Sequence, residues 1–117
     1  MLKHRPAKFK LPTGKCYITE IMELLGGTWT PALLWNLSDG ARRFSELKSY
    51  LAPISSKMLS SRLSQLQKKN VIKRIVMDTK PPSVEYELTD LGIELLPAIE
   101  KMAQIGARLR DYSENGK

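Results

Sequence analysis

The sequence has little of what metal centres, disulfide frameworks and catalytic dyads require. It contains one cysteine, Cys16, and one histidine, His4, among its 117 residues. A single cysteine excludes a disulfide within the chain and a multi-cysteine zinc site. His4 has no partner at the spacing of a metal site or a catalytic dyad. Because paired carboxylates and a phosphate-binding loop are also missing, the sequence predicts neither an enzyme nor a cofactor.

Long hydrophobic runs are missing as well. The longest apolar stretch is far short of the ~20 residues that a membrane-spanning helix needs. Residues 1–15 are basic but lack the apolar segment of a signal peptide. Hydrophobic residues make up 42% of the chain, which is enough to bury a core in one domain. The sequence therefore predicts a soluble, cytoplasmic domain with no membrane partner.

Acidic residues are scarce where basic residues gather. The net charge is +7, from 19 lysines and arginines against 12 acidic residues. Residues 42–80 alone carry ten basic and two acidic residues, and residues 1–15 carry five basic residues and no acid. Such a concentrated basic block is what a phosphate-backbone partner requires. The alternative reading of each charged stretch is an ordinary solvated surface.

Hydrophobic residues at helical spacing predict a mainly α domain. The expected helices cover residues 16–25, 31–37, 45–51, 56–69 and 89–112. Side chains that accept backbone N–H groups at helix starts are expected at Thr30, Ser45, Ser55 and Thr89. Asn70 is expected to end the fourth helix in a left-handed conformation. The aromatic residues expected in the core are Trp29, Trp35, Phe44 and Tyr50.

β-Branched and alternating residues predict a small β-hairpin after the fourth helix. Its strands cover residues 71–78 and 83–88, with a proline-containing tip at 79–82, and a further short strand is expected at 42–44. A short helix, a turn at 52–54 and a longer helix form a helix-turn-helix, and a hairpin directly after it forms a wing. The sequence thus predicts a winged helix-turn-helix over residues 16–112, preceded by a basic arm (1–15) and followed by a tail (113–117).

The longer helix of this motif has two contrasting faces. Leu59, Leu63 and Leu66 share an inward face, while the opposite face is polar or basic and holds no acid. The alternative is a solvated amphipathic helix, but exposed serines weaken a helix that has only a structural role. The DNA major groove admits such a helix. The residues expected to contact DNA from this helix and its start are Ser55, Ser56, Lys57, Ser60, Ser61, Ser64 and Gln65.

Further basic residues flank the motif on both sides. Arg42 and Arg43 precede its first helix, and Lys80 stands at the tip of the hairpin. Their positions suit contacts to phosphates or to the minor groove, and ordinary surface charge is the alternative. A winged-helix module that binds protein instead of DNA is a second candidate function. The basic block argues against it, because protein interfaces are depleted in lysine.

Several motifs along the chain match one known family. They are Cys16, Gly26-Gly27-Thr28-Trp29-Thr30, Gly40, Arg43-Phe44-Ser45-Glu46-Leu47, Ile54-Ser55-Ser56-Lys57-Met58-Leu59, Pro81-Pro82-Ser83-Val84-Glu85-Tyr86-Glu87-Leu88-Thr89, Gly92 and Pro97. Through them the chain resembles the HxlR-type winged helix-turn-helix regulators of bacteria, which are related to the MarR type. The resemblance implies a homodimer, formed through the first and last helices, that binds a pseudo-palindromic double-stranded DNA operator.

The same resemblance draws attention to Cys16. In some members of the family the matching cysteine senses oxidants or electrophiles, which implies control by such an effector or by a small molecule. Lys15 and the positive end of the expected first helix both lower the pKa of a thiol and favour the reactive thiolate. The alternative is a small, half-buried hydrophobic residue with no reactivity.

Overall fold

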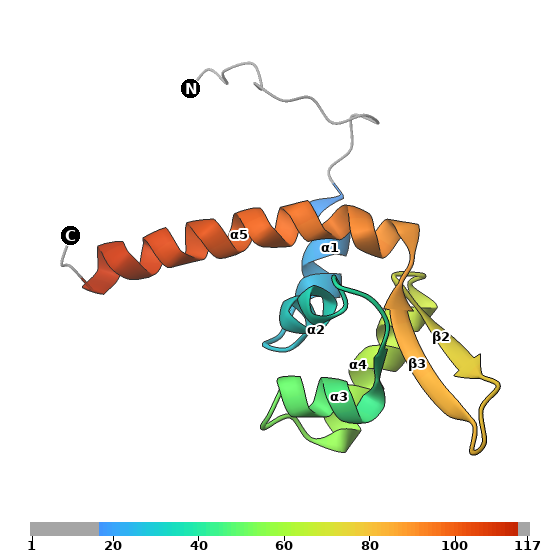
Figure 1. Ribbon diagram of the computed structural model, residues 1–117. Helices are drawn as coiled ribbons and strands as arrows, with labels where there is room; N and C mark the ends of the chain where they lie inside the picture. Colours follow the sequence, from blue (N-terminus) through green and yellow to red (C-terminus); the bar gives the residue numbers. More distant parts are fainter. Residues whose placement is uncertain (1–16, 115–117) are drawn as a thin grey trace.

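Residues 17–114 are described by the computed structural model, and they contain five helices and three strands (Figure 1). The order of elements follows the predicted one and confirms a mainly helical winged fold. The elements are α1 (Ile18–Leu25), α2 (Thr30–Asn36), β1 (Arg42–Arg43), α3 (Phe44–Tyr50), α4 (Ser56–Lys68), β2 (Ile72–Met77), β3 (Ser83–Leu88) and α5 (Asp90–Glu114). None of these helices is long and apolar enough to cross a membrane.

The core is built almost entirely from leucine and other branched aliphatic side chains. Leu59, Leu63 and Leu66 of α4 are buried, as their spacing predicts. They pack with side chains from every other helix and from the wing. The other buried apolar residues are Leu25, Leu33, Leu34, Leu37, Leu47, Leu51, Ile54, Val71, Ile72, Leu88 and Ile99.

Two aromatic residues expected in the core lie at the surface instead. Tyr50 is 59% exposed and Trp35 is 44% exposed. The reason is that α2 and α3 are only seven residues long, so a few leucines such as Leu34 and Leu47 already fill their inner faces. Trp29 and Phe44, by contrast, are half-buried against the core as predicted.

The start of α3 also differs from the prediction. Ser45 was expected to cap this helix, but α3 begins at Phe44 and its N-cap is Arg43. The backbone N–H of Arg43 donates to Oε1 of Glu46 at 2.8 Å. Because β1 runs directly into the helix, the extended residue that precedes the first helical turn is Arg43, one position before Phe44. Similarly, α2 begins at Thr30 with Trp29 as its N-cap, so Thr30 does not cap it.

The three strands form one antiparallel sheet in the order β1-β3-β2. Ile72 pairs with Leu88 at the base of the hairpin, and Met77 pairs with Ser83 near its tip. β1 joins the other edge of β3, where Arg42 pairs with Tyr86. The hairpin prediction is confirmed, and the structure adds that the short strand before the helix-turn-helix completes the sheet of the wing.

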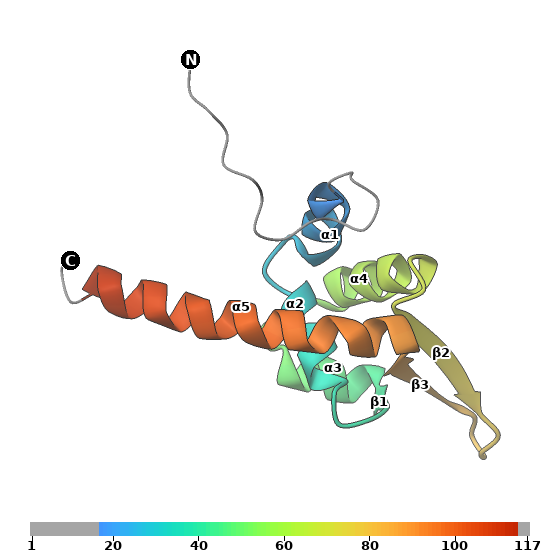
Figure 2. The ribbon, with the colours of Figure 1, turned by 90° about the horizontal axis from the view of Figure 1, so that it is seen from above.

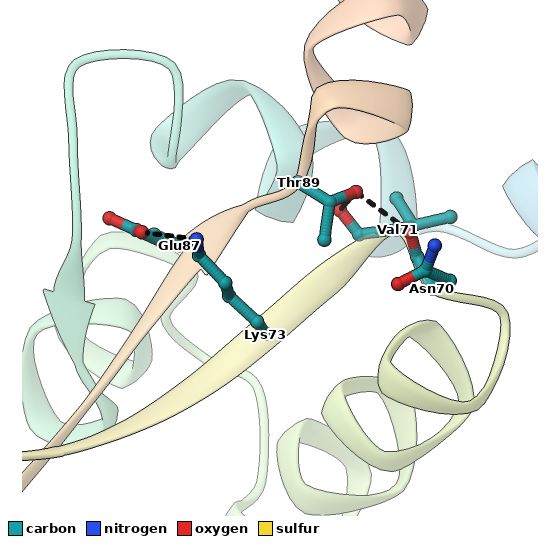
Figure 3. A network of polar contacts seen from close by, with 5 residues as sticks. All are labelled: Asn70, Val71, Lys73, Glu87 and Thr89. Atoms are coloured by element: carbon teal, nitrogen blue, oxygen red, sulfur yellow. Dashed lines mark hydrogen bonds and ion pairs between the residues drawn. The ribbon is translucent and has the colours of Figure 1, made fainter.

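Thr89 joins the end of α4, the base of the wing and the start of α5 (Figure 3). Its backbone N–H donates to the carbonyl oxygen of Val71 at 3.0 Å. Its hydroxyl lies 2.7 Å from the carbonyl oxygen of Asn70 and 3.0 Å from that of Val71, and it accepts the N–H of Gly92 at 3.2 Å. Asn70 has a φ of 62°, which confirms the predicted left-handed end of α4.

Gly92 allows this junction to close. It is buried in the first turn of α5, and a methyl group built on it would clash with the carbonyl oxygen of Val71 and press on the side chain of Leu88. Since the clash is with backbone, no change of side-chain rotamer can relieve it. Only glycine therefore allows α5 to lie directly against the residue where α4 leads into the wing.

We expect Gly92→Ala to lower the free energy of unfolding by about 1–3 kcal/mol, the typical cost of overpacking a closed site. Urea denaturation followed by circular dichroism measures this. Gly106→Ala is the matched control, because Gly106 lies in the same helix with nothing within 4 Å of its added methyl group. That variant should be as stable as the parent or more stable by up to about 1 kcal/mol. Equal stabilities for the two variants would contradict the close approach.

Candidate nucleic-acid interface

The exposed face of α4 is short-chained, polar and free of acid. Leu59, Leu63 and Leu66 point inward and Arg62 is half-buried, and the remaining positions of the helix are exposed. The sequence-predicted contact residues of α4 are all exposed, namely Ser56, Lys57, Ser60, Ser61, Ser64 and Gln65. Small side chains over two successive turns leave room for another surface to approach the helix backbone closely.

Ser55 has a structural task at the start of this helix. Its Oγ accepts the backbone N–H of Met58 at 3.0 Å, which confirms it as the N-cap of α4. The cap satisfies one of the N–H groups that an α-helix leaves without a partner at its start. The remaining N–H groups and the positive end of the helix dipole lie at this end of α4, which also carries Ser56 and Lys57, and an anion would be favoured there.

Gln65 is placed differently from the serines. Its Oε1 accepts a hydrogen bond from Nη1 of Arg62 at 3.0 Å. The side chain is thus directed along α4 toward the side that faces α1, where it also lines a pocket. The structure therefore separates Gln65 from the group formed by Lys57 and the exposed serines.

β1 and the wing add positive charge beside the helix-turn-helix. Arg43 is exposed, and Lys80 is exposed at the tip of the hairpin, which projects away from the body of the domain (Figure 1). Lys73, in contrast, is paired with Glu87 across β2 and β3 at 3.1 Å (Figure 3). Neither Arg43 nor Lys80 makes an ion pair with any residue in the range 17–114.

Arg42 is held against an aromatic ring that the sequence had assigned to the core. Its guanidinium carbon lies 5.8 Å from the centre of the Tyr50 ring, a distance typical of a cation–π contact. Its Nε is buried without a hydrogen-bond partner among residues 17–114. Tyr50 is thus a missed member of this surface. The signal that could have found it is the pair of leucines, Leu47 and Leu51, which together fill the inner face of so short a helix.

The arrangement has binding features and no catalytic ones among the residues described. No group of three or more histidine, cysteine or acidic side chains lies close enough to hold a metal ion in this part of the chain. The predicted contact residues come from α4, β1 and the wing tip, and Figure 1 shows these elements on one side of α5. Cys16, the predicted redox-sensing residue, lies outside the described residues.

Comparison with known proteins agrees with this geometry. Residues 24–114 match the family model of the HxlR-like helix-turn-helix. The chain belongs to the HxlR-like helix-turn-helix family. It is a DNA-binding transcriptional regulator of this type with a winged helix-turn-helix, which confirms the family and the fold that the sequence predicts. Proteins of this family are typically not enzymes.

Three transcriptional regulators are similar to this chain in sequence or in structure. The HTH-type transcriptional regulator YdeP of Bacillus subtilis (strain 168) is 36% identical over 96 residues, which cover 82% of this chain and 75% of YdeP. The redox regulator HypR in its reduced form is 32% identical, with a TM-score of 0.78 over 84% of this chain and 97% of HypR. The reduced transcriptional regulator YodB of B. subtilis is 30% identical, with a TM-score of 0.70 over 82% of this chain and 90% of YodB.

The N-cap of α4, the helix that carries the predicted DNA contacts, can be tested by itself. We expect Ser55→Ala to lower the free energy of unfolding by about 1 kcal/mol, because the N–H of Met58 loses its acceptor. The measurement is urea denaturation of both proteins. Ser60→Ala is the matched control, since Ser60 is exposed in the middle of α4 and alanine favours a helix there. If Ser55→Ala were as stable as Ser60→Ala, the capping bond would contribute nothing.

Proposed function

We propose that this regulator acts as a homodimer that binds a pseudo-palindromic double-stranded DNA operator. The observation that carries the proposal is the acid-free, serine-rich exposed face of α4, in a domain whose strand β1 and wing tip add exposed positive charge. A helix of this kind suits the major groove, and flanking cations suit the phosphates on either side of it. A winged-helix module that binds protein would not need this concentration of positive charge.

Within this proposal, the first half of α4 reads the bases. N-terminal residues of a recognition helix usually reach base edges, so Ser56, Lys57, Ser60 and Ser61 are the proposed base contacts. Ser64 lies further along the helix, and its proposed contact to DNA is at longer range. Gln65 would have to turn away from Arg62 to join it. The start of the helix at Ser55 offers its N–H groups to a phosphate.

The proposed phosphate contacts lie in β1 and at the tip of the wing. Arg43 and Lys80 are exposed and form no ion pair among residues 17–114, so they can approach a phosphate at little cost in lost ion pairs. Arg42 is already held in place by Tyr50, which reduces the entropy lost when its guanidinium binds an oxygen. The proposal therefore assigns Tyr50 a positioning role that the sequence did not suggest.

The dimer is proposed from apolar surface that one copy leaves uncovered. The second half of α5 extends beyond the rest of the domain (Figure 2) and every residue from 101 to 114 is exposed. Between α2 and α5 there is also a pocket of about 570 Å³ that includes Trp35 and Ile99. Apolar side chains that gather on an exposed helix face mark sites of protein–protein contact. The large apolar residues exposed on α1 and α5 are Ile18, Met22, Leu91, Ile93, Met102, Ile105 and Leu109.

Control by an effector is proposed on the basis of the relatives. HypR is a redox regulator, and YodB has been studied in a reduced and a diamide-treated form. For this chain the proposed redox-sensing residue is Cys16, which as the single cysteine can form a disulfide only with a second subunit or with a small thiol, or be alkylated by an electrophile.

Two lysine substitutions test the division between bases and phosphates. Against an operator selected from random DNA, we expect Lys57→Ala to cost about 1–3 kcal/mol on the selected sequence and much less on random duplex. Lys80→Ala should weaken both duplexes alike and lower the slope of log K against log salt by about 1. Fluorescence anisotropy at several salt concentrations measures both effects.

The pattern of losses decides between the candidate functions. Equal losses for both variants on every duplex would show that α4 does not read bases. DNA binding that is weak and independent of sequence at all salt concentrations would contradict the operator proposal and favour a module that binds protein.

The dimer has its own test on the projecting part of α5. We expect Leu109→Glu to convert the dimer to a monomer at micromolar concentration while leaving the helical circular dichroism unchanged, because Leu109 is 67% exposed in the single copy. Sedimentation velocity measures the change. Ala107→Glu is the control, since position 107 lies 200° round the helix from 109. A parent protein that is already monomeric would contradict the proposal.

A further inference from the structure

A second pocket lies on the opposite flank of α4 from its serine-rich face. It has a volume of about 580 Å³, which is within the range of small-molecule sites. α1, α4 and the first turn of α5 form its walls, and Figure 2 shows α1 and α4 together on one side of α5. Its apolar lining comes from Ile21, Leu24, Leu66, Val71 and Leu91.

Arg62 is the half-buried cation in this lining. Its Nε is buried and has no hydrogen-bond partner among residues 17–114, and only Nη1 has a partner, Gln65. Gly27 makes room for the guanidinium, since a Cβ there would lie 2.9 Å from Nη2. A charged side chain with one N–H group that has lost water without gaining a partner is costly, so an anion that supplied further acceptors to the guanidinium would be favoured.

We propose that this pocket binds a small apolar carboxylate, with the carboxylate on the guanidinium of Arg62 and the apolar part against the aliphatic side chains. The planar guanidinium can donate two parallel N–H groups to a carboxylate. The aliphatic walls favour an aromatic or alkyl carboxylate over a hydrated anion such as phosphate. The ligand would complete the hydrogen bonding that the protein leaves unfilled at Arg62.

Two acidic residues of α1 also line the pocket. Glu20 and Glu23 are exposed there, and neither forms an ion pair with Arg62 in the described structure. They would repel a bound carboxylate and weaken its binding. Their presence also defines the competing explanation, in which Arg62 is a structural partner of one of these carboxylates and the pocket has no ligand.

A ligand in the pocket would affect both dimerisation and DNA binding, the two activities proposed above. The ligand would contact α1, which lies in the proposed dimer surface, and α4, which carries the proposed DNA contacts. A ligand that prefers one relative position of these helices shifts DNA affinity by its preference for that position. This coupling rests on the proposed function, whereas binding of the carboxylate does not.

The site is tested on the full chain without DNA, with 2-naphthoate and octanoate as probes and 2-naphthamide and octanamide as neutral counterparts. At a concentration tenfold above its Kd, a bound carboxylate should raise the Tm by about 5 °C or more. The amides should raise it far less. Isothermal titration gives the Kd.

Variants distinguish a carboxylate-binding site from the competing explanation, in which Arg62 is a structural partner of an acidic residue of α1. Arg62→Leu should abolish the response to carboxylates and leave the Tm of the free protein unchanged or higher, because it removes a half-buried charge that has no ion pair in the described structure. Glu23→Gln should strengthen carboxylate binding several-fold. Lys48→Met, which removes one exposed charge from α3, is the control and should respond like the parent.

Three outcomes would overturn the proposal. The first is that no carboxylate raises the Tm at 10 mM, and the second is that Arg62→Leu responds as strongly as the parent. The third is that both Arg62→Leu and Glu23→Gln lower the Tm of the free protein, as a structural ion pair requires. If the site binds carboxylate but operator affinity changes less than about fivefold on adding it, only the coupling to DNA is overturned. Loss of DNA binding in the parent would instead contradict the proposed function.

Discussion

The close approach of α5 to the backbone at Val71 is the contact on which the arrangement of the domain depends. Gly92 removes the side chain that would block it, and Thr89 connects the last residues of α4 to the first turn of α5. Three elements with different tasks therefore share one small, fully packed joint. Because a buried joint of this kind has few alternative packings, the direction of α5 is set relative to α4 and the wing.

This joint separates two surfaces of opposite character. On one side the structure presents exposed serines, Lys57 and the cations of β1 and the wing tip, with the aliphatic side chains turned inward. On the other side α5 presents leucine, isoleucine and methionine to solvent. The proposed function, a homodimer that binds DNA, would use both surfaces of the domain. The pocket at Arg62 lies between them, in contact with α1, α4 and α5.

Local signals in the sequence predicted well wherever one interaction decides the outcome. The Ser55 cap, the left-handed Asn70 and the inward leucines of α4 all depend on residues within a turn or two of one another. The predictions that were wrong involve competition between elements. The N-cap of α3 is Arg43 and not Ser45, because β1 runs directly into that helix. Tyr50 remained exposed because leucines had already filled the inner face of a short helix.

The sequence by itself therefore determined the order of the elements, the location of the positive charge along the chain and the inward face of α4, because periodicity and composition are properties of single segments. Only the tertiary structure decided that β1 joins β3, that Arg42 rests on Tyr50, that Gln65 turns toward Arg62, and that a pocket opens beside that arginine. The strand pairing and the pocket depend on how residues far apart in the chain pack together. The contacts of Arg42 with Tyr50 and of Gln65 with Arg62 join nearer residues, but each depends on a side-chain orientation that the residue pattern does not specify.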